Sequence, residues 1–126
     1  MSLIKKKIRK NSFFDTLNKN FKKNLIKFNI DFKSRRDLIT LDDLFRYYQK
    51  MDKINLVGTF NIGSKKGFSV KEIVNEYFGK RLKNKKINYY FNKKVTHLTL
   101  SVKKIEKIFP NCGQKIYKNA LRELKK

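Results

Sequence analysis

The residues best suited to chemistry are two adjacent arginines and the carboxylate that follows them, Arg35-Arg36-Asp37. An arginine presents a planar fork of N–H donors that matches phosphate oxygens, and such bonds are stronger than those between neutral groups. The pair is therefore a candidate site for a phosphorylated ligand. The alternative for Arg36 is a surface ion pair with Asp37 or Asp42, which would contribute little to stability.

The other reactive side chains give no catalytic site. His97 stands alone on an expected strand, without a carboxylate nearby in the sequence, so we interpret it as a packed or surface histidine. Cys112 lies in an expected turn, and the chain has no Cys/His cluster with zinc-ligand spacing. Gly58, Gly63 and Gly67 are spaced neither as GxGxxG nor as GxxxxGKS/T, so we expect turn glycines. We therefore predict no catalytic residue, metal site or cofactor site of the chain's own.

Composition limits the chain to one domain or part of one, since it has 126 residues. Its hydrophobic content of 40% is enough for a folded core. No apolar run approaches the ~20 residues that a membrane span needs, and the segment after Met1 lacks the apolar stretch of a signal peptide. The single cysteine favours a reducing compartment, so we expect a cytoplasmic protein without a membrane partner.

The net charge of +23 indicates an anionic partner, which would be nucleic acid, an acidic membrane surface or a phosphorylated ligand. The lysines form clusters that are spread along the chain, at 5–7, 22–23, 65–66, 83–86, 93–94 and 103–104. The alternative is a codon bias, because Lys, Asn, Ile and Phe all have AT-rich codons. That bias does not explain why Asp and Glu number only 10. Both explanations stay open at this stage.

Helices are predicted from apolar residues spaced by three and four, and from capping residues at their starts. Ser12 and Ser101 are candidate N-caps, while Thr40 with Asp43 and Ser69 with Glu72 have the capping-box spacing. We expect Gly79 to end the third helix and Pro110 the fourth. The expected helices carry Phe13, Phe14, Leu17, Phe21 and Leu25; Leu44, Phe45, Tyr48 and Met51; Val70, Ile73, Val74, Tyr77 and Phe78; Val102, Ile105, Ile108 and Phe109; and Ile116, Tyr117, Ala120, Leu121 and Leu124.

Strands are predicted between these helices. Strict alternation over 26–32 is typical of a half-buried strand, and 57–62 has apolar residues on both faces, as a buried strand would. Shorter strands are expected at 38–41, 87–91 and 96–100. The pattern predicts an α/β fold over residues 11–126, preceded by a basic, frayed lead-in over residues 1–10.

Three segments, in this order, resemble the extended short-chain dehydrogenase/reductase family of nucleotide-sugar epimerases and dehydratases. The segment 35–44, RRDLITLDDL, is similar to the family's "RDFIyVdDl", with Leu38 where an aromatic residue is usual. The segment 58–64, GTFNIGS, followed by SVKEIV at 69–74, resembles "gvyNiGsg…SvlEiv". The segment 98–105, LTLSVKKI, resembles "lDiSKi", with Ser101 in place of the usual Asp. With Asn11-Ser12-Phe13-Phe14 upstream, the resemblance covers about residues 11–125.

The resemblance implies the C-terminal, substrate-binding subdomain of a Rossmann-type enzyme that lacks the NAD-binding sheet. It implies that Arg36, and less directly Arg35, contacts the diphosphate of a UDP- or dTDP-sugar. Asn61 would be either a substrate contact or a turn residue. The family's second arginine, in an "RxGD" setting, is missing here, and Lys93 or Lys94 would supply its charge. We expect the strand end that carries Arg36 and the Asn61 bend to form parts of one pocket.

The resemblance also indicates what the chain leaves to a partner. The family's catalytic Tyr and Lys lie four residues apart on a helix, whereas Tyr89…Lys93 and Tyr90…Lys94 lie in an expected strand, so we assign neither pair to catalysis. NAD(P), which the intact family binds, would come with a separately encoded NAD-binding half, or the chain would form a homo-oligomer. The alternative hypotheses are a small basic nucleic-acid-binding module and a non-functional remnant or misassigned gene start.

Overall fold

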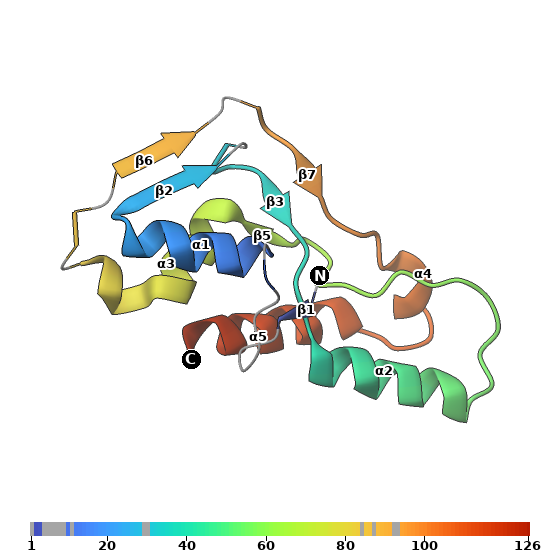
Figure 1. The fold of residues 1–126 in the computed structure, drawn as a ribbon. Helices are drawn as coiled ribbons and strands as arrows, with labels where there is room; N and C mark the ends of the chain where they lie inside the picture. The colour runs from blue at the N-terminus through green and yellow to red at the C-terminus, as the bar shows by residue number, and fades with distance from the viewer. Residues whose placement is uncertain are drawn as a thin grey trace.

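The computed structural model describes residues 2–3, 10, 12–28, 31–83, 85–86, 88–91 and 94–126. These residues form the predicted α/β fold, in which helices pack beneath several short strands (Figure 1). No helix among them has the length and apolar character to cross a membrane.

The helices begin where the sequence places polar caps. Helix α1 spans Phe13–Lys22, α2 Leu41–Lys53, α3 Val70–Phe78, the short α4 Lys103–Glu106 and α5 Cys112–Lys125, and a 3-10 turn spans Gly79–Leu82. The hydroxyls of Ser12, Thr40 and Ser69 each accept a bond from the backbone N–H three residues on. Ser69 and Glu72 form the complete capping box, since the Glu72 carboxylate accepts the Ser69 N–H at 2.7 Å. Gly79 ends α3 at φ 52°, as predicted.

The strands are short and form separate small sheets. Strand β3 (Arg35–Arg36) lies at the centre of a three-stranded sheet, antiparallel to β5 (Phe68–Ser69) and parallel to β7 (His97–Leu98). Strand β2 (Leu25–Phe28) pairs in parallel with β6 (Asn88–Phe91). Strand β1 (Ser2–Leu3) pairs in parallel with β4 (Ile39–Thr40). The start of the expected lead-in is therefore paired rather than frayed.

The core consists of two apolar clusters that share helix α5. The first lies among α1, α3 and α5 and contains Phe14, Leu17, Leu38, Phe68, Val70, Ile73, Val74, Phe78, Ala120 and Leu124. The second lies among α2, α4 and α5 and contains Ile39, Tyr47, Val102, Ile105, Cys112 and Ile116. Because one half of α5 packs in each cluster, this helix joins the two parts of the described fold (Figure 1).

The predicted buried strand at 57–62 is wrong. This segment is an extended loop, and the Val57 side chain is 90% exposed. Gly58 has a φ angle of 124°, which is incompatible with a regular strand. Within the described residues no neighbouring strand pairs with this segment.

Smaller errors concern element ends. Ser101 does not cap a helix, since α4 begins after Val102 without a side-chain cap and is a single turn. Leu25 belongs to β2 rather than to the first helix, and Leu41 begins α2 rather than ending a strand. The strand expected over 26–32 holds as far as Phe28, and its residues 29–30 lie outside the described part.

Candidate functional site

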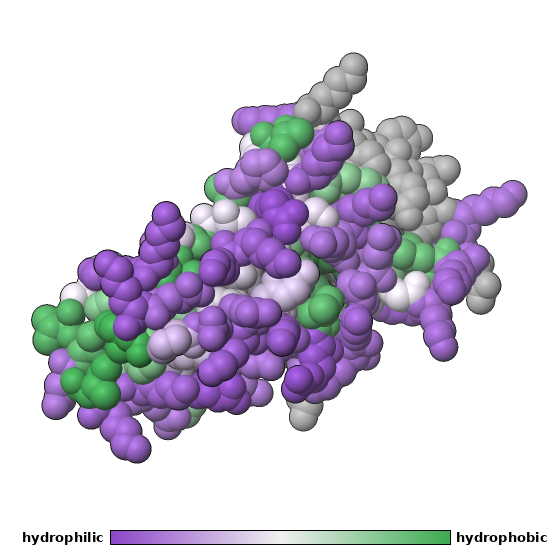
Figure 2. Space-filling model, turned by 180° about the vertical axis from the view of Figure 1, so that it is seen from behind, coloured by the Kyte–Doolittle hydropathy of each residue, from purple (hydrophilic) through white to green (hydrophobic). Residues whose placement is uncertain are grey.

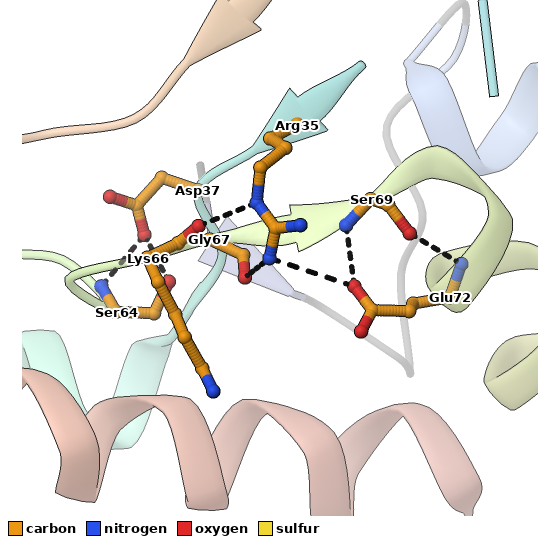
Figure 3. Close-up of polar contacts among 7 residues, drawn as sticks. All are labelled: Arg35, Asp37, Ser64, Lys66, Gly67, Ser69 and Glu72. Atoms are coloured by element: carbon orange, nitrogen blue, oxygen red, sulfur yellow. Dashed lines mark hydrogen bonds and ion pairs between the residues drawn. The ribbon is translucent and has the colours of Figure 1, made fainter. Parts of the chain in front are cut away.

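The end of β3 is organised around the buried carboxylate of Asp37, which is 8% exposed. Its Oδ1 accepts the backbone N–H of Ser64 at 2.7 Å and the Ser64 hydroxyl at 2.5 Å (Figure 3). Its Oδ2 accepts the backbone N–H of Leu100 at 3.1 Å. One carboxylate therefore ties together the strand end 35–37, the bend 61–64 and the segment 98–101.

Gly63 brings the bend against this carboxylate. A Cβ atom placed at Gly63 would lie 2.3 Å from Asp37 Oδ2, so no side chain fits there. Asn61, two residues earlier, is exposed. The predicted proximity of the arginine-bearing strand end and the Asn-Gly bend is thus present, while a ligand role for Asn61 stays a prediction.

Arg36 is held by the backbone before β7. Its Nη1 donates to the carbonyl oxygens of Arg35 and Thr96, both at 2.8 Å, and its Nη2 donates to Thr96 Oγ1 at 3.0 Å. Within the described residues it forms no ion pair with Asp37 or Asp42, which was the alternative interpretation. Arginine has five N–H donors, so its Nε–H and one Nη2–H have no partner in the described chain. Arg36 is half-buried and fixed in position, and one edge of its fork has no partner among the described residues.

The Arg35 side chain lies on the opposite side of β3 from that of Arg36, because successive side chains of a strand point to opposite faces. Its Nε donates to the Lys66 carbonyl at 2.8 Å and its Nη2 to the Gly67 carbonyl at 2.9 Å (Figure 3). The Glu72 carboxylate lies 3.8 Å from the same Nη2. This guanidinium fixes the loop before β5 to the start of α3, which is a structural role on the edge that it uses.

Of the two lysines proposed to supply the charge of the family's second arginine, only Lys94 lies in the described part of the chain. Lys94 is exposed and lies two residues before Thr96, the residue that holds Arg36. Lys93 lies outside the described residues. Among the described residues no hydrogen bond joins Asn61 or Lys94 to Arg36, and a site shared by these residues stays a prediction.

The residues that support the candidate site through internal hydrogen bonds were not predicted from the sequence. Asp37 was considered only as an ion-pair partner, and Ser64 and Thr96 were not considered as supports. The available signal was the charged Asp37 beside the apolar Leu38-Ile39 pair, both of which are buried. A carboxylate next to a buried segment needs internal donors, and Ser64 in the bend and Leu100 in the segment between β7 and α4 supply them.

Burial shifts the pKa of three titratable groups among the described residues, and none of the three lies at Arg36. Burial raises the pKa of the Cys112 thiol, and the nearby Glu106 raises it further. Burial also raises the pKa of the Tyr47 and Tyr117 phenols. Cys112 is therefore a neutral, buried thiol, and His97 is exposed on β7. In the described part of the chain, His, Cys, Asp and Glu do not gather in a group that could hold a metal ion.

No family model and no curated protein matches this chain. Similar solved structures include RMD from Pseudomonas aeruginosa complexed with NADPH, at a TM-score of 0.49 and 12% identity, covering 82% of this chain and 36% of that one. A "putative epimerase" from Burkholderia cenocepacia J2315 aligns at a TM-score of 0.48 and 15% identity, covering 87% of this chain and 39% of that one. The chain thus spans less than two-fifths of the length of either structure.

Proposed function

We propose that this chain is the C-terminal, substrate-binding portion of an NAD(P)-dependent nucleotide-sugar epimerase, dehydratase or reductase of the extended short-chain dehydrogenase/reductase family. In this role it contacts the diphosphate of a UDP- or dTDP-sugar. An NAD-binding half that lies outside this sequence supplies the cofactor and the catalytic residues, because this sequence contains neither the Gly-rich dinucleotide turn nor a helical Tyr/Lys pair.

The observation that carries the proposal is the convergence on Asp37. The Asp37 carboxylate belongs to the first of the three segments that resemble the family. It binds Ser64 of the second segment, 27 residues further on, and Leu100 of the third segment, 63 residues further on. A chance likeness of three short segments would not require them to meet at one point. Their meeting supports the hypothesis that they form one functional unit, as the resemblance of the three segments implies.

The position of Arg36 supports the diphosphate contact. Thr96 holds the guanidinium through two bonds, so little conformational entropy is lost when a ligand binds its remaining edge. The Nε–H and an Nη2–H point in parallel from a planar group, the arrangement that binds two phosphate oxygens at once. In this interpretation Lys94 adds positive charge to the same side of the sheet.

An exposed apolar surface supports the need for a second half. Leu41, Leu44, Phe45 and Tyr48 lie on one face of α2 with spacings of three and four residues, and all four are exposed. Figure 2 shows hydrophobic side chains gathered at the end of the molecule where α2 and the following loop lie. An apolar surface of this kind is typical of a protein interface, and we assign it to the NAD-binding half.

Calorimetric titration with UDP-glucose and dTDP-glucose tests the diphosphate contact. Arg36→Gln should weaken binding by about 10- to 150-fold, the loss expected for charge-assisted hydrogen bonds. Arg36→Lys keeps the charge without the fork and should also bind more weakly than the wild type. Arg122→Gln is the matched control, because it removes one exposed arginine charge from α5. Equal affinity of the wild type and Arg36→Gln would remove Arg36 from the site.

The proposal further implies that the purified chain has no epimerase, dehydratase or reductase activity by itself. Incubation with NAD⁺ and each sugar nucleotide should therefore give neither NADH absorbance nor a new sugar product. Turnover by the pure polypeptide would contradict the assignment of catalysis to a second half.

The net charge of +23 favours a second candidate, a nucleic-acid-binding module. Binding driven by phosphate contacts would fall about 10³-fold between 50 and 200 mM salt for six contacts. Titration of single-stranded and duplex oligonucleotides over this salt range distinguishes the two functions. If no binding is detected at 50 mM salt, the nucleic-acid hypothesis is excluded.

A further inference from the structure

A cavity of about 420 Å³ lies between the loop 64–66 and helix α5. This volume falls in the range of pockets that hold small ligands. The loop contributes Ser64, Lys65 and Lys66 to its lining, and α5 contributes Tyr117 and Lys118. Arg36 does not line it, so this cavity is separate from the site proposed above.

The loop wall of the cavity is held firmly from behind. Asp37 accepts both polar hydrogens of Ser64, and Arg35 donates to the carbonyl of Lys66. On the other side, a Cβ atom at Gly113 would lie 2.8 Å from Lys65 Cβ, so the loop crosses the first turn of α5 in close contact. The backbone of the loop that forms one wall of the cavity is therefore fixed in place.

Tyr117 provides a flat apolar wall. One face of its ring stacks on the buried Phe68, with centroids 4.4 Å apart and an interplanar angle of 7°. The Lys66 ammonium lies 4.7 Å from the centroid of the same ring. Because Phe68 fills one face, Lys66 covers the other. A planar ring can take the place of this flexible side chain and stack on Tyr117 at little cost.

The rim of the cavity is cationic. Lys65, Lys66 and Lys118 line it, and Glu106 is the one carboxylate in the lining, 3.5 Å from Lys65. Two positive charges therefore remain after that pair is counted, in a molecule whose overall field is also positive. The ligand that fits carries a planar ring for Tyr117 and an anionic group for the lysines.

We propose that this cavity binds a free nucleotide, with the base stacked on Tyr117 and the phosphate between Lys65, Lys66 and Lys118. A nucleotide at the end of a single-stranded nucleic acid has the same chemistry. The cavity favours the free ligand, because only one aromatic ring of the described residues lines it, whereas strand binding uses successive aromatic platforms. This site does not depend on the function proposed for Arg36.

Calorimetric titration of the full chain with UMP tests the site, with uridine and inorganic phosphate as part-ligands. UMP should bind at least about tenfold more tightly than either part-ligand, since each lacks one of the two contacts. The double variant Lys65→Gln/Lys118→Gln should weaken UMP binding by at least about tenfold. Its matched control is Lys103→Gln/Lys107→Gln, which removes two exposed charges outside the cavity and should leave UMP affinity unchanged.

The stacking contact is tested separately. Tyr117→Leu should weaken UMP binding by about 5- to 150-fold, while Tyr117→Phe, which keeps the ring, should change it less than about twofold. The lysine variants keep the test decisive if Tyr117→Leu does not fold, because their side chains are exposed. Equal losses in the lysine variant and its control would overturn the site in favour of diffuse charge attraction. Equal affinity for UMP and phosphate would overturn the ring contact. If an oligouridylate of ten nucleotides binds more tightly than ten independent UMP units would, the assignment of the cavity to a free nucleotide is overturned.

Discussion

Replacing Asp37 by Asn removes the negative charge from the convergence point while keeping the shape of the side chain. In the wild type Oδ1 accepts two bonds from Ser64 and Oδ2 accepts one from Leu100. An asparagine has a single acceptor oxygen. If that oxygen keeps the Ser64 bonds, the amide NH₂ faces the Leu100 N–H, and two donors then meet without an acceptor.

The cost follows from these three bonds. Hydrogen bonds to charged groups contribute about 1.5–3 kcal/mol and neutral ones about 0.5–1.5 kcal/mol. The variant loses the Leu100 bond and weakens the two Ser64 bonds, which amounts to a destabilisation of about 3 kcal/mol. That is a large fraction of the 5–15 kcal/mol typical of a domain. At about 4 °C per kcal/mol, the melting temperature should fall by about 12 °C.

Urea unfolding followed by circular dichroism measures the change. With a slope of about 2 kcal/mol per molar urea, the midpoint of Asp37→Asn should fall by about 1.5 M. Asp52→Asn is the matched control, because Asp52 is exposed near the end of α2, and its effect should stay within about 0.5 kcal/mol. A double-mutant cycle with Ser64→Ala should give a coupling of about 0.5–3 kcal/mol. If Asp37→Asn unfolds at the same urea concentration as the control, the carboxylate does not hold the three segments together.

Three further predictions concern the same framework. Gly63→Ala should destabilise the protein by about 3 kcal/mol in urea unfolding, because its Cβ would lie 2.3 Å from Asp37 Oδ2; an unchanged midpoint would show that the bend can move away. Ser69→Ala removes the capping box of α3 and should cost about 0.5–2 kcal/mol by the same assay, and a cost below about 0.3 kcal/mol would mean that the box is not formed. The raised pKa values of Cys112, Tyr47 and Tyr117 mean that the folded state favours their neutral forms. Their contribution to stability is fully present below the unfolded-state pKa values and is lost as pH rises through the folded ones, so the urea midpoint should fall above about pH 8.5; a midpoint that rises from pH 8 to pH 10.5 would contradict this.

Local signals in the sequence predicted the helices well. Ser12, Thr40 and Ser69 each interact with the residue three positions on, so the cap and its partner lie in the same short segment. Strand 57–62 was mispredicted because a strand also needs a neighbour, and an apolar pattern cannot show whether that neighbour is present. The exposed Val57 is the direct consequence.

In the candidate site, too, local features were predicted, whereas contacts between distant parts of the sequence were not. The arginine pair and the Asn-Gly bend were predicted as neighbours from their resemblance to a known arrangement. Their supports could not be predicted, because Thr96 lies 60 residues from Arg36 and Leu100 lies 63 residues from Asp37. Nothing in the local sequence indicates which of two adjacent arginines will serve the loop before β5 and which will keep a free edge.

Arginine Nε–H resonances, observed by ¹⁵N-edited NMR during titration with UDP-glucose, test the assignment of Arg36 most directly. The chain has six arginines, and the Nε–H of Arg36 is free in the described structure whereas that of Arg35 donates to Lys66. We predict a saturable shift of the Arg36 resonance, with those of Arg35 and Arg122 unmoved. If the Arg36 resonance stays in place while other signals report a bound sugar nucleotide, the diphosphate does not contact this guanidinium.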